Sequence, residues 1–150
     1  MLWSLGGLAL ATPVAVTWWS GRTPDHDAVK LTVEEAFARA QDGSLTLIDI
    51  RTPNEWRTTG VPLSGQPLDM RRADFIAALD EITGGSRDAP IALICARGVR
   101  SARMTLALQD AGYSQIIDVP EGMLGSGAGP GWLETGLPVS QWAGSSEGSE

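Results

Sequence analysis

The sequence is poor in two residue types on which many catalytic sites depend, since its 150 residues contain one cysteine, Cys95, and one histidine, His26. A single cysteine excludes an internal disulfide and a dithiol redox pair, and one histidine beside it cannot complete a Cys/His zinc site. We therefore expect neither a metal nor another cofactor. A Ser-His-Asp hydrolase would depend on His26, which lies in a stretch without a secondary-structure signal. Nucleophilic chemistry thus falls on Cys95.

Basic residues are also few. Eleven Lys and Arg residues stand against 18 Asp and Glu residues, which gives a formal net charge of -7. Such a chain has no general attraction for nucleic acid, so we expect no nucleic-acid partner. The length and the 43% share of hydrophobic residues allow one domain with a core but leave no room for two.

The N-terminal segment is the exception to this ordinary composition, because residues 2–19 carry no charge. The run is at the short end of what spans a bilayer, contains Gly6, Gly7 and Pro13, and lacks the preceding Lys or Arg of a secretory signal. We expect residues 1–20 to be a hydrophobic signal or membrane anchor, with membrane association through residues 2–19. This predicts a membrane-anchored or exported, periplasmic protein rather than a cytoplasmic one. The alternative is an extension packed on the domain.

The remaining chain divides by composition into three parts. Residues 21–30 are polar and read as a linker, residues 31–140 form the domain, and residues 141–150 form a disordered polar tail. Helical patterns alternate with short apolar strands inside the domain, which predicts an α/β fold with a mostly parallel sheet and helices on both faces. The expected helices cover residues 33–40, 54–58, 75–82 and 101–111, the expected strands cover residues 45–50, 91–94 and 116–119, and glycines make residues 121–131 a mobile loop.

The segment CARGVRS, residues 95–101, carries the most informative pattern because it joins an apolar strand to a helix. Inward-pointing backbone N–H groups, the positive end of the helix dipole and the charges of Arg97 and Arg100 all favour a thiolate at Cys95 over a thiol. Gly98 supplies the permissive backbone that such a turn needs. Asp49 lies near the end of the strand expected at residues 45–50, so both residues fall at the edge of the sheet where ligands bind. The alternative is an inert cysteine at the end of a strand.

This loop resembles the C-x-x-G-x-R loop of the rhodanese-domain (thiosulfate sulfurtransferase-like) family. The segments LIDIRTPNEW (residues 47–56), GYSQIIDVPEGM (residues 112–123) and GWLETGLPV (residues 131–139) are similar to other parts of that family, in the family's order. The resemblance covers residues 32–139 and implies a single-domain member with the rhodanese-like three-layer fold.

The resemblance implies a sulfurtransferase that moves a sulfane sulfur from thiosulfate or another small donor to a thiol, cyanide or protein acceptor through a Cys95 persulfide. Arg97 would bind the sulfonate end of the donor. Arg100 would do the same or would fix the loop by pairing with Asp49. The residues implied for substrate binding are Ala96, Arg97, Gly98, Val99 and Arg100, and those implied for structural support are Asp49, Arg51 and Ser101, the first two as an ion pair.

Other functions stay open. A sulfur relay or a partner-binding rhodanese module would use the same fold, and a relay would also use the Cys95 persulfide. Phosphatases and arsenate reductases of this fold have the longer loop C-x5-R, whereas here the arginine follows after four residues and Ser101 follows after five. The family often has a histidine before its next strand, which GVPLSG (residues 60–65) lacks, and Ala96 stands where some thiosulfate-using members have arginine. The identity of the donor is therefore open.

Overall fold

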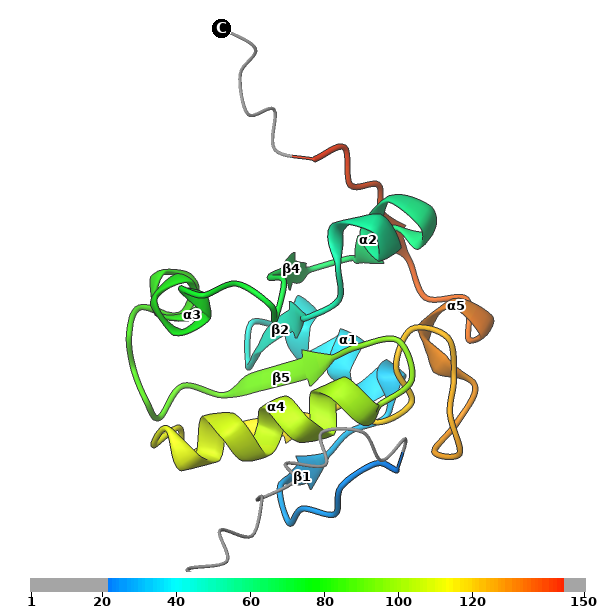
Figure 1. Cartoon of the computed structure of the whole chain (residues 1–150). Coiled ribbons are helices and arrows are strands. Elements are labelled where there is room, and N and C mark those ends of the chain that lie inside the picture. Colours follow the sequence, from blue (N-terminus) through cyan, green and yellow to red (C-terminus); the bar gives the residue numbers. More distant parts are fainter. Residues whose placement is uncertain (1–21, 145–150) are drawn as a thin grey trace, which may run out of the picture.

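Parallel strands form the central sheet of the computed structural model, which describes residues 22–144. Figure 1 shows the sheet with helices packed against it. Every pairing in this sheet is parallel, which confirms the predicted α/β class. The five strands lie in the order β1 (Val29–Lys30), β6 (Ile116–Asp118), β5 (Ile91–Ile94), β2 (Thr46–Asp49) and β4 (Gly65–Pro67), and a separate antiparallel pair joins β3 (Val61–Pro62) to β7 (Val139–Ser140).

Hydrophobic residues pack on both faces of the sheet, as the three-layer fold requires. On one face Ile48 and Leu93 of the sheet lie in a cluster with Phe75 and Leu108. On the other face Leu47 and Ile94 lie with Val33 and Trp132. The helices that supply these residues are α3 (Phe75–Thr83) and α4 (Val99–Asp110) on the first face, and α1 (Val33–Gln41) and α5 (Gly131–Glu134) on the second; α2 (Pro53–Thr59) follows β2.

Two helices begin with the same local motif. Thr32 caps α1 and Thr52 caps α2, and in each case a glutamate three residues later returns a hydrogen bond to the backbone of the capping residue. The fourth helix, α4, begins at Val99, two residues before the expected start, because Gly98 at φ 85° serves as its N-cap. The loop that holds Cys95 is therefore continuous with the first turn of this helix.

Part of the expected linker belongs to the domain. Val29 and Lys30 pair with β6, and Nε2 of His26 lies 2.9 Å from Oδ2 of Asp118, with both side chains 1% exposed. The composition does not reveal the strand β1, because the side chains of Val29 and Lys30 are both exposed. The strand is held by backbone hydrogen bonds, which leave no hydrophobic pattern.

The glycine-rich loop of residues 121–131, for which the composition predicts mobility, is packed against the domain. Buried Glu121 accepts hydrogen bonds from the backbone N–H groups of Val33 and Gly131. A Cβ atom on Gly122 would lie 2.3 Å from the carbonyl oxygen of Ala96. The glycines thus allow close backbone packing, which composition alone does not distinguish from mobility.

The expected polar tail also contains a packed residue, Trp142. The ring of Trp142 meets that of buried Trp56 at a centroid distance of 5.2 Å, and the guanidinium of Arg57 lies 5.1 Å from the Trp142 ring. Residues 145–150 and the apolar segment 2–19 lie outside the described residues. Within residues 22–144, no helix has the length and hydropathy needed to cross a membrane.

Candidate active site

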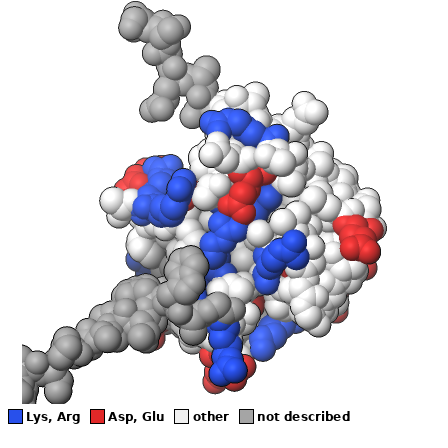
Figure 2. Space-filling model, turned by 45° about the vertical axis from the view of Figure 1, so that its right-hand side comes forward, with Lys and Arg blue, Asp and Glu red and all other residues white. Residues whose placement is uncertain are grey.

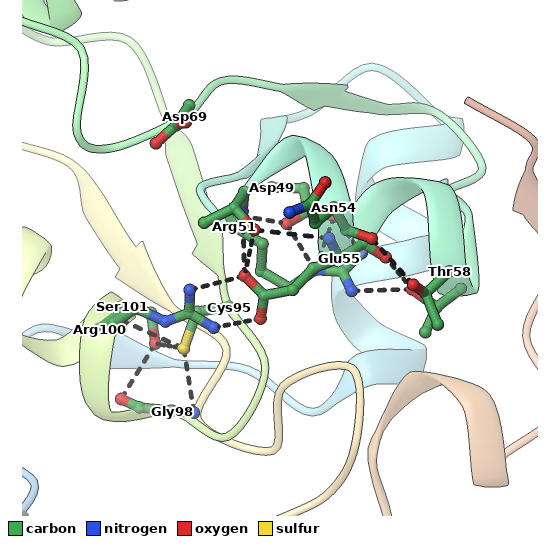
Figure 3. Close-up of polar contacts among 12 residues, drawn as sticks. Asp49, Arg51, Asn54, Glu55, Thr58, Asp69, Cys95, Gly98, Arg100 and Ser101 are labelled. Carbon is green, nitrogen blue, oxygen red and sulfur yellow. Dashed lines mark hydrogen bonds and ion pairs between the residues drawn. The ribbon is translucent and has the colours of Figure 1, made fainter. Parts of the chain in front are cut away.

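Cys95 directly follows β5 and sits at the base of the segment from residue 95 to residue 101, here called the Cys95 loop (Figure 3). The residue is 1% exposed. Its Sγ accepts hydrogen bonds from the backbone N–H groups of Gly98, at 3.1 Å, and Ser101, at 3.4 Å. These two N–H dipoles at the start of α4 stabilise negative charge on the sulfur.

Ser101 does more than the structural support expected of it. Its hydroxyl oxygen lies 3.6 Å from Sγ of Cys95, where it accepts a hydrogen bond from the thiol, and its own proton is donated to the carbonyl oxygen of Gly98 at 3.1 Å. Ser101 is fully buried. It therefore contacts the sulfur through both its backbone and its side chain, and it fixes the curvature of the loop.

Two other members of the Cys95 loop, Ala96 and Arg97, form hydrogen bonds with the glycine-rich segment. The carbonyl oxygen of Ala96 accepts a hydrogen bond from the N–H of Leu124 at 2.9 Å. Arg97 is exposed, and its Nη1 donates to the carbonyl oxygen of Gly125 at 3.4 Å. Val99 is the first residue of α4. Arg97 thus lies at the surface of the loop with a neutral partner.

Arg100 does not pair with Asp49, which corrects one of the two roles expected for it. Its Nη1 and Nη2 atoms donate to Oε2 and Oε1 of Glu55 at 2.8 and 2.6 Å. Both carboxylate oxygens of Asp49 accept hydrogen bonds from Arg51 instead. The hydrogen bonds from Arg100, together with those from Thr52, lower the pKa of Glu55 to about 2.

Glu55 is the site residue that the sequence analysis missed. The pattern Thr52-Pro53-Asn54-Glu55 is a capping box, which predicts that Glu55 turns back toward the start of α2. It does not predict an arginine 45 positions later as partner. The helix signal was present in the sequence, but the ion pair depends on the packing of α2 beside the Cys95 loop.

The expected pair of Asp49 and Arg51 is present and buried. Nε of Arg51 donates to both carboxylate oxygens of Asp49, at 2.9 and 3.1 Å, and Nη2 donates to Oδ2 at 2.7 Å. The same guanidinium reaches Oγ1 of Thr59 at 2.8 Å and the carbonyl oxygen of Gly60 at 2.9 Å. Arg51 therefore connects the end of β2 to the end of α2 and holds the helix that carries Glu55.

A small pocket opens beside this helix. Its volume is about 240 Å³, and Glu55 of α2 and Leu124 of the glycine-rich segment lie among its lining residues. Leu124 binds the Ala96 carbonyl through its backbone, so the pocket adjoins the Cys95 loop. The remaining lining residues are Arg51, Asn54, Thr58 and Thr59.

The site thus combines a parallel α/β sheet with a buried cysteine, at the end of a strand, whose sulfur accepts hydrogen bonds from two backbone N–H groups. The chain belongs to the Rhodanese-like domain family, whose model matches residues 32–125. No curated protein matches the chain. The family assignment confirms the resemblance drawn from the motifs.

Several solved structures are similar to this chain in fold. A polysulfide-sulfur transferase homodimer from Wolinella succinogenes is 25% identical, with a TM-score of 0.60 over 79% of this chain and 82% of that one. A thiosulfate sulfurtransferase from Pseudomonas aeruginosa is 21% identical, with a TM-score of 0.60 over 76% of this chain and 20% of that one. A protein of unknown function from Rhodopseudomonas palustris, described as a possible tyrosine phosphatase, is 23% identical, with a TM-score of 0.56 over 75% of this chain and 85% of that one. The family assignment and the similarity to the Wolinella succinogenes transferase support a sulfurtransferase-type family, while the other two neighbours support the fold alone.

Proposed function

We propose that the protein is a sulfurtransferase in which Cys95 carries the transferred sulfur as a persulfide. The observation that supports this most strongly is the pair of N–H groups, from Gly98 and Ser101, that point at Sγ. The same donors that stabilise a thiolate before the reaction serve the terminal sulfur anion of a persulfide after it.

The reaction has two displacement steps. The Cys95 thiolate attacks the outer sulfur of a sulfane donor, a new S–S bond forms, and the donor's own bond to that sulfur breaks. With thiosulfate, sulfite leaves with the electron pair of the broken bond. An acceptor nucleophile, such as a thiolate or cyanide, then attacks the outer sulfur and returns Cys95 to the thiolate.

Arg97 is our proposed contact for the anionic end of the donor. It is exposed on the Cys95 loop, and the partner that it contacts is an uncharged carbonyl group. An anion can therefore approach its guanidinium without first displacing a carboxylate. Ala96, Gly98 and Val99 would contribute the backbone around the donor.

A sulfurtransferase assay run in parallel with a phosphatase assay tests this function. We expect the protein to form thiocyanate from cyanide and a sulfane donor, and we expect Cys95→Ala to form none. The phosphatase reading is less favoured because the loop has one residue fewer than C-x5-R. Hydrolysis of a phosphate ester without thiocyanate formation would overturn the assignment.

Membrane association through residues 2–19 and an exported or membrane-anchored location stay predictions, because those residues lie outside the described range.

A protein donor in place of a small molecule would make the same chemistry a sulfur relay. Transfer of sulfur from a protein persulfide, in the absence of any turnover of small donors, would identify that function.

A further inference from the structure

A carboxylate stands at the Cys95 loop, where the proposed substrates are themselves anions. Figure 3 shows the guanidinium of Arg100 between Cys95 and the carboxylate of Glu55. The hydrogen bonds from Arg100 to Glu55 raise the pKa of Arg100, and nearby Cys95 contributes in the same direction to a smaller extent. The side chains of Arg100 and Glu55 are 32% and 31% exposed, so both reach the surface beside the Cys95 loop.

Glu55 is fixed in this place from two sides. Its Oε2 accepts hydrogen bonds from the backbone N–H and the hydroxyl of Thr52, each at 3.0 Å, as well as from Arg100. Its Oε1 accepts the second bond from Arg100, at 2.6 Å. Because the capping box and the arginine hold the same carboxylate, displacing it would break four hydrogen bonds, two of them charge-assisted on both sides.

The charges around the sulfur then favour donors of low charge. The positive charge of Arg100 is balanced by Glu55, so the Cys95 loop offers an incoming anion the charge of Arg97. A monoanion, such as a thiosulfonate RSO₂S⁻ or a persulfide RSS⁻, can be matched by that one charge. Thiosulfate carries two negative charges, and the second would face the Glu55 carboxylate without a partner.

We infer that, given the proposed sulfurtransferase function, Glu55 is a specificity-determining residue that makes this site select monoanionic sulfane donors over dianionic ones. It acts by neutralising Arg100 and by repelling the second charge of a dianion. The substrate class is thus the thiosulfonates and organic persulfides, with thiosulfate a poor donor.

The test compares a dianionic and a monoanionic sulfane donor, thiosulfate and methanethiosulfonate, in the wild-type protein and in the Glu55→Gln variant. Glutamine keeps an oxygen to accept hydrogen bonds from Thr52 and Arg100 but removes the charge. We expect Glu55→Gln to raise kcat/KM for thiosulfate on the order of 3- to 10-fold, mainly through KM, and to change kcat/KM for methanethiosulfonate by less than about 2-fold. Both are assayed as thiocyanate formed from cyanide, so the acceptor step is shared.

Glu35→Gln provides a matched control, because Glu35 occupies the corresponding position in the capping box of α1. It should leave both kcat/KM values unchanged. If the wild-type protein uses both donors and Glu55→Gln leaves the ratio of their kcat/KM values unchanged, the selective role of Glu55 is overturned while the proposed function stands. Wild type that forms thiocyanate from neither donor would overturn the proposed function, and the role of Glu55 with it.

A second measurement needs no variant and holds if Glu55→Gln fails to fold. Sulfate and methanesulfonate are unreactive anions of about the size of the sulfonate end of the donor. Sulfate carries two negative charges and methanesulfonate carries one. Methanesulfonate should inhibit the wild-type enzyme at a lower concentration than sulfate, competitively with the donor, once ionic strength is held constant. Stronger inhibition by sulfate would contradict the inference.

Discussion

Among single residues, Gly98 has the most direct control over the Cys95 loop. Its φ of 85° turns its N–H toward Sγ, and a Cβ atom there would lie 2.3 Å from the carbonyl oxygen of Pro120. Gly98→Ala should therefore lower the free energy of unfolding by about 2–4 kcal/mol and sulfur transfer by at least about 10-fold. Urea denaturation and the thiocyanate assay measure the two effects.

Gly112→Ala is the matched control for this substitution. Gly112 has a similar φ of 92°, but nothing lies within 4 Å of its Cβ position. Its replacement should cost about 1 kcal/mol of stability, from the backbone conformation alone, and should leave sulfur transfer unchanged. If the two substitutions lowered sulfur transfer equally, the loss at Gly98 would come from the general cost of alanine at a positive φ and not from a change in the Cys95 loop.

The Glu55 carboxylate gives a pH dependence of stability with a definite sign. The pKa of Glu55 in the folded protein is about 2, below its ordinary value of 4.5. Its contribution is thus complete above about pH 5 and is lost as the pH falls through about 2. The difference in unfolding free energy between wild type and Glu55→Gln should be constant from about pH 7 to pH 5 and should shrink below that range. A difference that persists to about pH 2 would show that the charge of Glu55 is not its source.

Among the secondary-structure elements, β1 depends on a buried pair outside the strand itself. His26 and Asp118 are in contact, and Nδ1 of His26 and Oδ1 of Asp118 are buried without a partner among the described residues. His26→Ala would leave the Asp118 carboxylate buried without its partner. We expect a loss of about 2–4 kcal/mol in unfolding free energy and faster hydrogen exchange at the N–H of Leu31, which binds the carbonyl of Asp118.

The exposed neighbour Asp25 supplies the control for that pair. Asp25→Asn should change the unfolding free energy by less than about 0.5 kcal/mol. If His26→Ala were equally neutral, the segment before β1 would be no more than the linker that its composition suggests.

The elements that could be predicted are those whose pattern is local. The helices expected at residues 33–40 and 75–82 are examples: α1 begins at the capping box of Thr32 and Glu35, and α3 ends at Gly84, whose φ is 76°. The strands β1, β3 and β7 have two residues each, and so short a strand has no periodicity to detect. These strands exist because a partner strand lies beside them, which is a property of the fold.

Across the domain as a whole, the distribution of charge departs from its total. The net charge is -7, yet Figure 2, which brings forward the side toward which β5 points in Figure 1, shows several groups of basic side chains on that face. The sequence predicted the basic loop, because Arg97 and Arg100 are near Cys95 in the chain. It could not predict that Glu55 cancels one of these charges, since the pair joins elements far apart in the sequence.

The mass of the intact protein tests the central claim, that Cys95 carries sulfur, most directly. After incubation with methanethiosulfonate or thiosulfate and removal of the donor, we predict an increase of about 32 Da, one sulfur atom, located on the peptide that contains Cys95. The adduct should disappear on addition of cyanide and should not form in Cys95→Ala. Wild-type protein that gains no sulfur from either donor, or gains it without losing it to an acceptor, would contradict the account.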